Sequence, residues 1–87
     1  MSEPLRTEVT VMDPRGLHMR VATEITRASR AFKSTLKITA GKRTADAKSP
    51  LSMMSLAAPT GTKLVISADG EDAQTALDCL VKVLSTP

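Results

Sequence analysis

The sequence predicts an α+β domain in which a four-stranded sheet, antiparallel or mixed, carries its helices on one face. Four segments have the alternation or composition of strands, and three others have apolar residues at helical spacing. The two kinds follow one another in the order strand, helix, strand, strand, helix, strand, helix, which favours a sheet covered by helices. At 87 residues the chain is short enough for one domain, which we assign to residues 1–87.

The first strand is predicted over residues 7–12, where polar and apolar residues alternate and Val9 and Val11 share one face. The DPRG sequence that follows has the proline and glycine of a turn. A helix is then predicted from Met19 to Phe32, because apolar residues recur there along one helical face. These residues are Val21, Ala22, Ile25, Ala28 and Phe32.

Residues 34–40 alternate again and predict a second strand, which a turn at Gly41 connects to a short strand over Arg43–Ala47. Ser49 and Pro50 then predict the start of a helix, because serine caps free amides and proline suits the first helical position. Pro59 and Gly61 limit this helix to about two turns.

The sequence TKLVISA, residues 62–68, predicts the fourth strand. The acids of DGED are expected to open the last helix, where its dipole favours negative charge. The buried stripe of that helix is predicted to be Ala73, Ala76, Leu77, Leu80 and Leu84. Cys79 lies to one side of the stripe and is interpreted as a packing residue. The open face of the sheet is expected to carry polar residues such as Thr10, Lys37 and Thr39.

Composition places the chain among globular domains, with 41% hydrophobic and 24% charged residues. No apolar run approaches the roughly 20 residues that cross a bilayer, so no membrane association is expected. The N-terminal MSEPLRTEVTV has an early acid and no continuous apolar core, unlike a signal peptide. A single cysteine fits a reducing compartment, and the cytoplasm is the expected location.

The net charge of +3 indicates acidic partners. Nucleic acid is not expected, because single-stranded binders use aromatic side chains for base stacking and Phe32 is the only aromatic residue. The lysines and arginines also form no dense cluster.

The single histidine, His18, lies in the sequence GLHMRVAT. A zinc site made from His18 and Cys79 alone would lack two ligands, so no metal and no cofactor is expected. No serine lies in a nucleophile-elbow sequence, although composition alone leaves a catalytic triad possible. His18 is therefore either a nucleophile or a structural residue.

The surroundings of His18 favour the nucleophile. Gly16 allows close backbone approach, and a helix start places the free amides of Met19 and Arg20 beside the ring. The helix dipole favours the neutral, nucleophilic imidazole. The same amides and the forked guanidinium of Arg20 suit a phosphoryl group once it is attached. Such a site holds a phosphoryl group without burying it, as a carrier requires.

These residues resemble the HPr family, the histidine phosphocarrier proteins of the bacterial phosphoenolpyruvate-dependent sugar phosphotransferase system. The family motif Gly-Leu-His-(small)-Arg-Pro-Ala corresponds here to GLHMRVA, residues 16–22. A second landmark, a Lys-Ser pair that heads a short helix, corresponds to KSPLSMMSLA, residues 48–57. The C-terminal GTKLVISADGEDAQTALDCLVKVL is also similar to the last strand and helix of the family.

The resemblance implies an open-faced β-sandwich of four antiparallel strands and three helices. It implies a phosphoryl carrier and not an enzyme, in which Nδ1 of His18 accepts phosphate from phosphorylated enzyme I and passes it to a IIA-type domain. Arg20 matches the arginine that steadies the phosphoryl group. Ser49 matches a serine that an HPr kinase phosphorylates in some lineages; the alternative is that Ser49 only caps its helix.

Several residues depart from the family pattern and indicate a divergent member. Val21 replaces the proline and adds a backbone donor, and Met19 replaces a small residue beside the histidine. Pro50 follows Ser49 where kinase-recognised members usually have an aliphatic residue, and Ala57 stands where glycine is common. Two alternatives to a role in sugar uptake therefore remain. One is a regulatory phosphorelay, and the other is an interaction module with the same fold and little or no phosphotransfer.

The docking surface of the family is matched by Leu51, Met54, Arg27 and Arg30. An apolar spot ringed by arginines suits acidic partners that bind briefly. The alternative is that Leu51 and Met54 pack inward against the sheet. A carrier that docks two partners in turn is expected to be a monomer.

Overall fold

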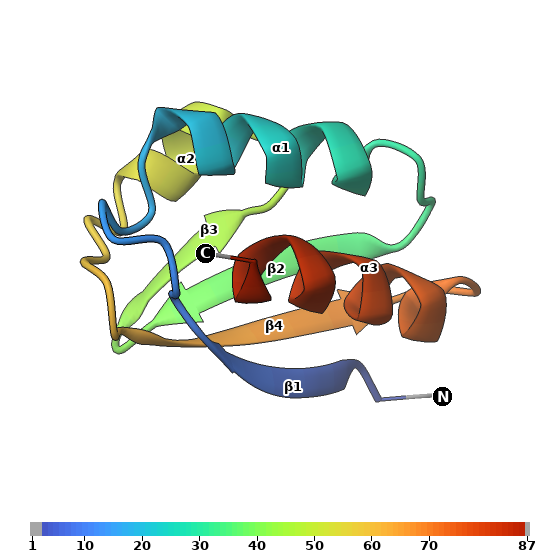
Figure 1. The fold of residues 1–87 in the computed structure, drawn as a ribbon. Helices are drawn as coiled ribbons and strands as arrows, with labels where there is room; N and C mark the ends of the chain where they lie inside the picture. The colour runs from blue at the N-terminus through green and yellow to red at the C-terminus, as the bar shows by residue number, and fades with distance from the viewer. Residues whose placement is uncertain (1–2, 87) are drawn as a thin grey trace.

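The computed structural model describes residues 3–86 and contains four strands and three helices. In chain order these are β1 (Leu5–Thr10), α1 (Met19–Ser29), β2 (Thr35–Ala40), β3 (Arg43–Asp46), α2 (Pro50–Met54), β4 (Lys63–Asp69) and α3 (Ala73–Ser85). All strand pairs are antiparallel, in the order β1-β4-β2-β3. The helices lie on one side of this sheet (Figure 1). The predicted fold class is confirmed, and the sheet is antiparallel, not mixed.

The core lies between the sheet and the helices. The stripe predicted for α3 is buried as expected, and Cys79 beside it is half-buried. Lys37 lies on the opposite, open face of the sheet, whereas its neighbours Leu36 and Ile38 are buried. Successive side chains of a strand point to opposite faces of the sheet, and polar and apolar residues therefore alternate along the sequence of the strand.

The first strand runs over Leu5–Thr10 and not over residues 7–12, but its buried face was predicted correctly, since Val9 and Val11 are both buried. Regular pairing with β4 stops at Thr10. The Val11 amide still donates to the Thr62 carbonyl at 2.9 Å, which holds the beginning of the next loop against the sheet.

The helix predicted to reach Phe32 ends at Ser29. The amides of Ala31 and Phe32 donate to carbonyls only three residues back, at 3.2 and 3.1 Å, so the chain tightens and leaves the helix. Phe32 remains half-buried against the core. The apolar period continued through this turn, and the prediction was wrong there by one turn.

The short helix α2 is five residues long, which is less than the two turns expected. Its start was predicted correctly: the Ser49 Oγ accepts from the Ser52 amide at 3.2 Å, and Pro50 is the first helical residue. Beyond the helix, Ala57 adopts the left-handed region with a φ of 49°. This conformation favours glycine, which explains the residue that the family commonly has there.

Asp72 lies at the start of the last helix, as the acidic DGED sequence predicted, but its carboxylate binds another loop. It occupies the N-cap position of α3, yet its side chain makes no capping bond. Its carboxylate instead accepts from the amides of Lys33 and Ser34, at 2.9 and 3.0 Å, and from the Ser34 hydroxyl. Asp72 thus joins the α1–β2 loop to the β4–α3 loop, and these donors, the Ser34 hydroxyl first, lower its pKa.

We expect Asp72→Ala to lower the thermal unfolding midpoint at neutral pH by several degrees. Because the pKa of Asp72 is lower in the folded state, its contribution is complete above the unfolded-state value of about 4 and is lost as the pH falls through the folded-state value. Circular dichroism melts of both proteins from neutral pH into acid should therefore converge. Asp78→Ala, which removes only an exposed bond to Gln74, is the control. A difference between wild type and Asp72→Ala that does not change with pH would contradict this account.

None of the helices within residues 3–86 is both long enough and apolar enough to span a bilayer.

Candidate functional site

His18 lies at the point where the loop after β1 enters α1. It is the N-cap residue, its backbone is extended (φ −96°, ψ 175°), and its side chain is 21% exposed. The loop is anchored on both sides of Gly16, whose φ is +77°. The Gly16 amide donates to the Asp13 carbonyl at 2.8 Å, and the Leu17 amide donates to the Ala58 carbonyl at 2.8 Å. The ring is therefore presented at the surface by a loop with fixed ends.

Free amide groups surround the helix start, as the sequence predicted. The first bond of α1 runs from the Ala22 amide to the His18 carbonyl, at 3.0 Å. The amides of Met19, Arg20 and Val21 precede this bond and so have no acceptor within the helix. Together with the helix dipole they form a local positive end that suits an anion.

Asp13 is the site residue that sequence analysis missed. Its side chain is 7% exposed. One carboxylate oxygen accepts from the Arg15 amide at 2.9 Å. The other lies 3.2 Å from Nε2 of His18 and 2.8 Å from Nη2 of Arg20. An Asp-Pro sequence signals a turn closed by a bond from the Asp side chain to a nearby amide, but it does not reveal the contacts of the second oxygen.

The donors around Asp13 lower its pKa, the Arg15 amide first and the His18 ring next, and they outweigh the opposing effect of burial. Asp13 is therefore ionised at neutral pH, and an ionised carboxylate only accepts hydrogen bonds. The proton of a neutral His18 ring then lies on Nε2. Among the described residues, Nδ1 has no hydrogen-bond partner.

Arg20 contacts the same Asp13 oxygen as the His18 ring, and two carboxylates engage its guanidinium. Its Nη2 donates to Asp13, and its Nη1 donates to Oε1 of Glu24 at 3.0 Å. The pair with Glu24 is exposed and spans one turn of the helix, and pairs of this kind contribute little stability. The Nη1 group of Arg20 can therefore exchange Glu24 for another anion at low cost.

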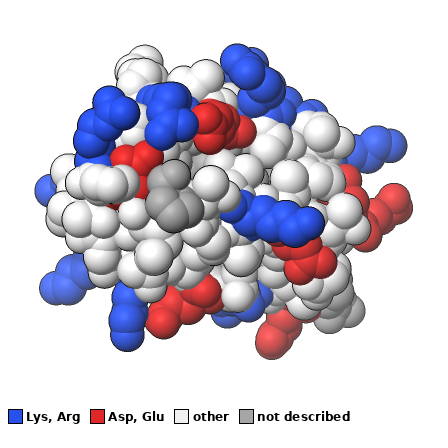
Figure 2. All heavy atoms as spheres, viewed as in Figure 1, with Lys and Arg blue, Asp and Glu red and all other residues white. Residues whose placement is uncertain are grey.

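The predicted docking residues divide into two groups. Leu51 on α2 is 77% exposed, and Met19 at the start of α1, which was not among the predicted docking residues, is 48% exposed. Met54 is half-buried and packs against the core, so the inward-packing alternative applies in part to it and not to Leu51. Arg27 and Arg30 are exposed. Basic side chains are spread over the face shown, on the helical side and also along the sheet side, with acidic groups between them (Figure 2).

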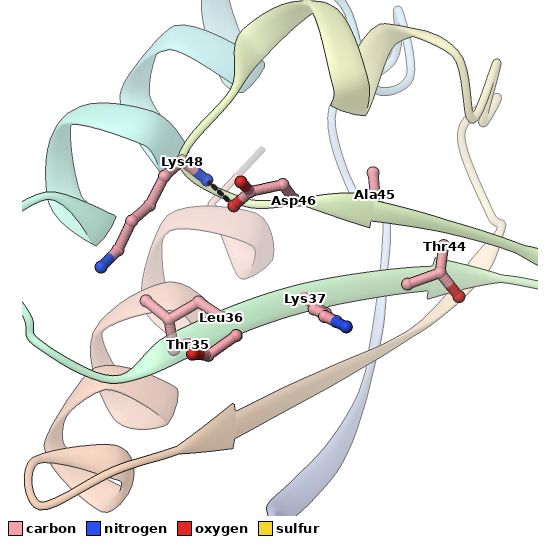
Figure 3. A pocket seen from close by; sticks show the side chains of 7 residues that line it. All are labelled: Thr35, Leu36, Lys37, Thr44, Ala45, Asp46 and Lys48. Carbon is pink, nitrogen blue, oxygen red and sulfur yellow. Dashed lines mark hydrogen bonds between the residues drawn. The ribbon is translucent and has the colours of Figure 1, made fainter.

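Two further features lie outside this site. Within residues 3–86 no three His, Cys, Asp or Glu side chains come together as a metal site. A shallow hollow follows β2 and β3, where Lys37 and Lys48 are among the lining residues (Figure 3). The Lys48 ammonium already donates to the Phe32 carbonyl at 2.9 Å. None of the predicted site residues lines this hollow.

Comparison with known proteins identifies close relatives. The family described as "PTS HPr component phosphorylation site" matches residues 5–86. The phosphocarrier protein HPr of Haemophilus influenzae is 40% identical over 79 residues, which cover 91% of this chain and 93% of that protein. The HPr of Cupriavidus necator is 33% identical over 81 residues, 93% of this chain and 91% of that protein. The crystal structure of an HPr from Bacillus anthracis superposes with a TM-score of 0.90 at 30% identity, over 95% of this chain and 99% of that one.

Proposed function

Because the chain belongs to the HPr family of phosphocarrier proteins, we propose that His18 accepts a phosphoryl group on Nδ1 from phosphorylated enzyme I and passes it to a IIA-type protein. An HPr is a carrier that is itself phosphorylated, not an enzyme that turns over a small substrate. The observation that carries the proposal is the partly exposed His18 ring at a helix start, with Nε2 facing Asp13 at 3.2 Å and Nδ1 left for the phosphoryl group.

The transfer step needs no proton movement on the carrier. The Nδ1 lone pair attacks phosphorus, the bond from phosphorus to the donor breaks, and its electron pair stays with the donor. The His18 ring keeps its Nε2 proton and gains positive charge. The free amides at the start of α1 and the Arg20 guanidinium stabilise the phosphoryl oxygens during transfer. Because the site is partly open, the same group is accessible to the next acceptor.

The partner surface in this proposal combines the exposed apolar side chains of Met19 and Leu51 with the charges of Arg27 and Arg30. An apolar centre with a basic rim favours acidic partners and speeds their encounter. Ser49 stands where an HPr kinase acts in some family members. A phosphate there would add negative charge at the start of α2 and weaken docking of acidic partners.

The test is incubation with enzyme I and radiolabelled phosphoenolpyruvate, followed by addition of a IIA-type protein. Acid-labile label that appears on this chain and then moves to the acceptor is the expected result. An enzyme I preparation that labels another HPr but not this chain would contradict the proposal.

The alternative, a regulatory interaction module, is favoured by one observation: Met19, beside the ring, is large and 48% exposed, where the family has a small residue. If Met19 shields the ring, the labelling test separates the two functions. Label on Met19→Ala but none on the wild-type chain would identify a module in which transfer is sterically blocked.

Arg20→Ala is expected to slow labelling by about tenfold or more, since a hydrogen bond to a charged group contributes about 1.5–3 kcal/mol. Transfer rates from enzyme I provide the measurement. Arg30→Ala is the matched control, because Arg30 is exposed at the other end of α1. Its loss should weaken enzyme I binding in a salt-dependent way and leave the rate at saturating enzyme I unchanged. Equal effects of the two variants at saturation would exclude a role for Arg20 at the phosphoryl group.

A further inference from the structure

One carboxylate oxygen of Asp13 contacts both functional side chains of the site. Oδ2 lies 3.2 Å from Nε2 of His18 and 2.8 Å from Nη2 of Arg20. The residue itself is held firmly: Oδ1 accepts from the Arg15 amide at 2.9 Å, and the Asp13 carbonyl accepts from the Gly16 amide at 2.8 Å. The turn before α1 therefore fixes the position of Oδ2.

We propose that Asp13 is a positioning residue for phosphoryl transfer, which holds the ring proton of His18 on Nε2, directs Nδ1 to the phosphoryl group and keeps Arg20 beside the ring. This proposal rests on the proposed function of His18. It adds a residue whose role neither the motif around His18 nor the turn sequence indicates.

The role in the ring follows from donor and acceptor chemistry. A neutral imidazole has one N–H and one lone pair, and the hydrogen bond at one nitrogen decides which is which. A buried, ionised carboxylate can only accept, so the nitrogen that faces it must donate. Nδ1 then has the lone pair that attacks phosphorus. When the new bond forms, the ring becomes positively charged, and the Asp13 carboxylate stabilises that charge from the far side.

The role of Asp13 toward Arg20 follows from the two carboxylates that bind the guanidinium, Asp13 and Glu24. Glu24 is exposed, whereas Asp13 is buried. On phosphorylation the phosphoryl oxygens can displace Glu24 from Nη1 while Nη2 remains on Asp13. Asp13 therefore restricts the Arg20 side chain in advance. Arg20 then loses less conformational freedom when it binds the phosphoryl group.

Two substitutions separate these effects from the fold. In Asp13→Asn, an amide that keeps its oxygen on Arg15 presents its NH2 to His18 and Arg20. This donor favours a ring protonated on Nδ1 and opposes the guanidinium. In Asp13→Ser, the hydroxyl can still accept from the Arg15 amide and preserve the turn, but no group reaches Nε2. Asp13→Asn therefore shifts the proton of the neutral His18 ring toward Nδ1. Asp13→Ser removes the preference for either nitrogen.

The primary measurement is the 15N chemical shifts of the His18 ring in the unphosphorylated chain at about pH 9, where imidazole is neutral. The wild type should show a ring protonated almost entirely on Nε2. Asp13→Asn should raise the fraction protonated on Nδ1, and Asp13→Ser should give an intermediate value. Asp72→Asn is the matched control, because Asp72 also accepts two backbone amides, but these belong to Lys33 and Ser34, beyond the C-terminal end of α1 and away from His18 at its start. It should leave the ring unchanged.

Transfer rates from enzyme I should fall about 10- to 100-fold in Asp13→Asn, as when the residue that orients a reactive group is lost, and less in Asp13→Ser. Wild-type shifts in Asp13→Asn would overturn the proposal, as would an altered ring with an unaltered rate, or an equal fall in rate in Asp72→Asn. The NMR result does not depend on phosphorylation. A wild-type chain that takes no label would therefore refute the proposed function, while the shifts would still show whether Asp13 controls the ring.

Discussion

Replacing His18 with alanine is expected to abolish the acid-labile phosphate that this chain receives from phosphorylated enzyme I, a loss of more than about 1,000-fold. His18 is the only histidine in the sequence, so no second imidazole can replace it. Arg20 stabilises charge and has no nucleophilic lone pair at neutral pH. The amides at the start of α1 can donate hydrogen bonds to an anion but cannot form a bond to phosphorus. The nucleophile therefore has no substitute in the site.

The fold should survive this change. His18 occupies the N-cap position of α1, but its side chain makes no capping bond, so alanine removes none. Asp13 keeps its bonds to Arg15 and Arg20. His18→Asn is a second test, because asparagine is a favourable N-cap. Both variants should give the wild-type circular dichroism spectrum and no acid-labile label after incubation with enzyme I and labelled phosphoenolpyruvate. Acid-labile label on either variant would place the acceptor elsewhere, and acid-stable label would point to a hydroxyl such as that of Ser49.

The fold was largely predictable because most elements bury one face of a regular period. In α3 every residue of the predicted stripe is buried, and in β1 the alternation identified the correct face although the bounds were two residues late. Ser49 and Pro50 predicted the start of α2 because capping is a local interaction. Hydrophobic periods and helix caps involve residues that are close together in the sequence, and the sequence alone therefore reveals them.

The end of α1 was not predictable, because it depends on an interaction between residues far apart in the sequence. The apolar period runs on to Phe32, but the amides of the following loop are bound by Asp72, which is 39 and 38 residues away from Lys33 and Ser34. In the sequence, Asp72 has the features of a helix-opening acid. Only the packing of the two loops against each other shows that its carboxylate is used elsewhere.

In the proposed site, the sequence pointed to His18 and Arg20 but not to the Asp13 carboxylate that contacts both. His18, Met19 and Arg20 are neighbours in the chain, and their helix start brings their groups together. Asp13 is separated from His18 by a turn whose geometry depends on Gly16 and on the Ala58 carbonyl. A one-dimensional pattern does not specify which oxygen of Asp13 faces the ring.

This dependence on Gly16 gives the second large expected effect: Gly16→Ala should lower the free energy of unfolding by at least about 3 kcal/mol and reduce phosphoryl transfer as well. A side chain at a φ of +77° costs about 1–2 kcal/mol by itself. A Cβ at Gly16 would also lie 2.6 Å from the Ala58 carbonyl oxygen and 2.9 Å from Cα of Pro59. Both are backbone atoms, so no rotamer change relieves the overlap.

The same overlap connects stability to the site. The Ala58 carbonyl accepts the Leu17 amide at 2.8 Å, and this bond anchors the residue next to His18. If the backbone moves to admit the new Cβ, the bond lengthens and the ring shifts relative to Asp13. Denaturant unfolding should be followed by circular dichroism, because the chain has no tryptophan or tyrosine, with transfer rates measured under native conditions.

Gly61→Ala is the matched control for Gly16→Ala. Gly61 has a φ of +87°, so alanine meets a similar backbone penalty, but its Cβ would have no atom within 4 Å apart from its neighbours in the chain. We expect a loss of about 1–2 kcal/mol and no change in the transfer rate. The difference between the two variants then measures the close approach of the His18 loop to residues 58–59. Equal losses would mean that backbone conformation alone requires glycine at position 16, and that the contact with Ala58 does not set the position of the ring.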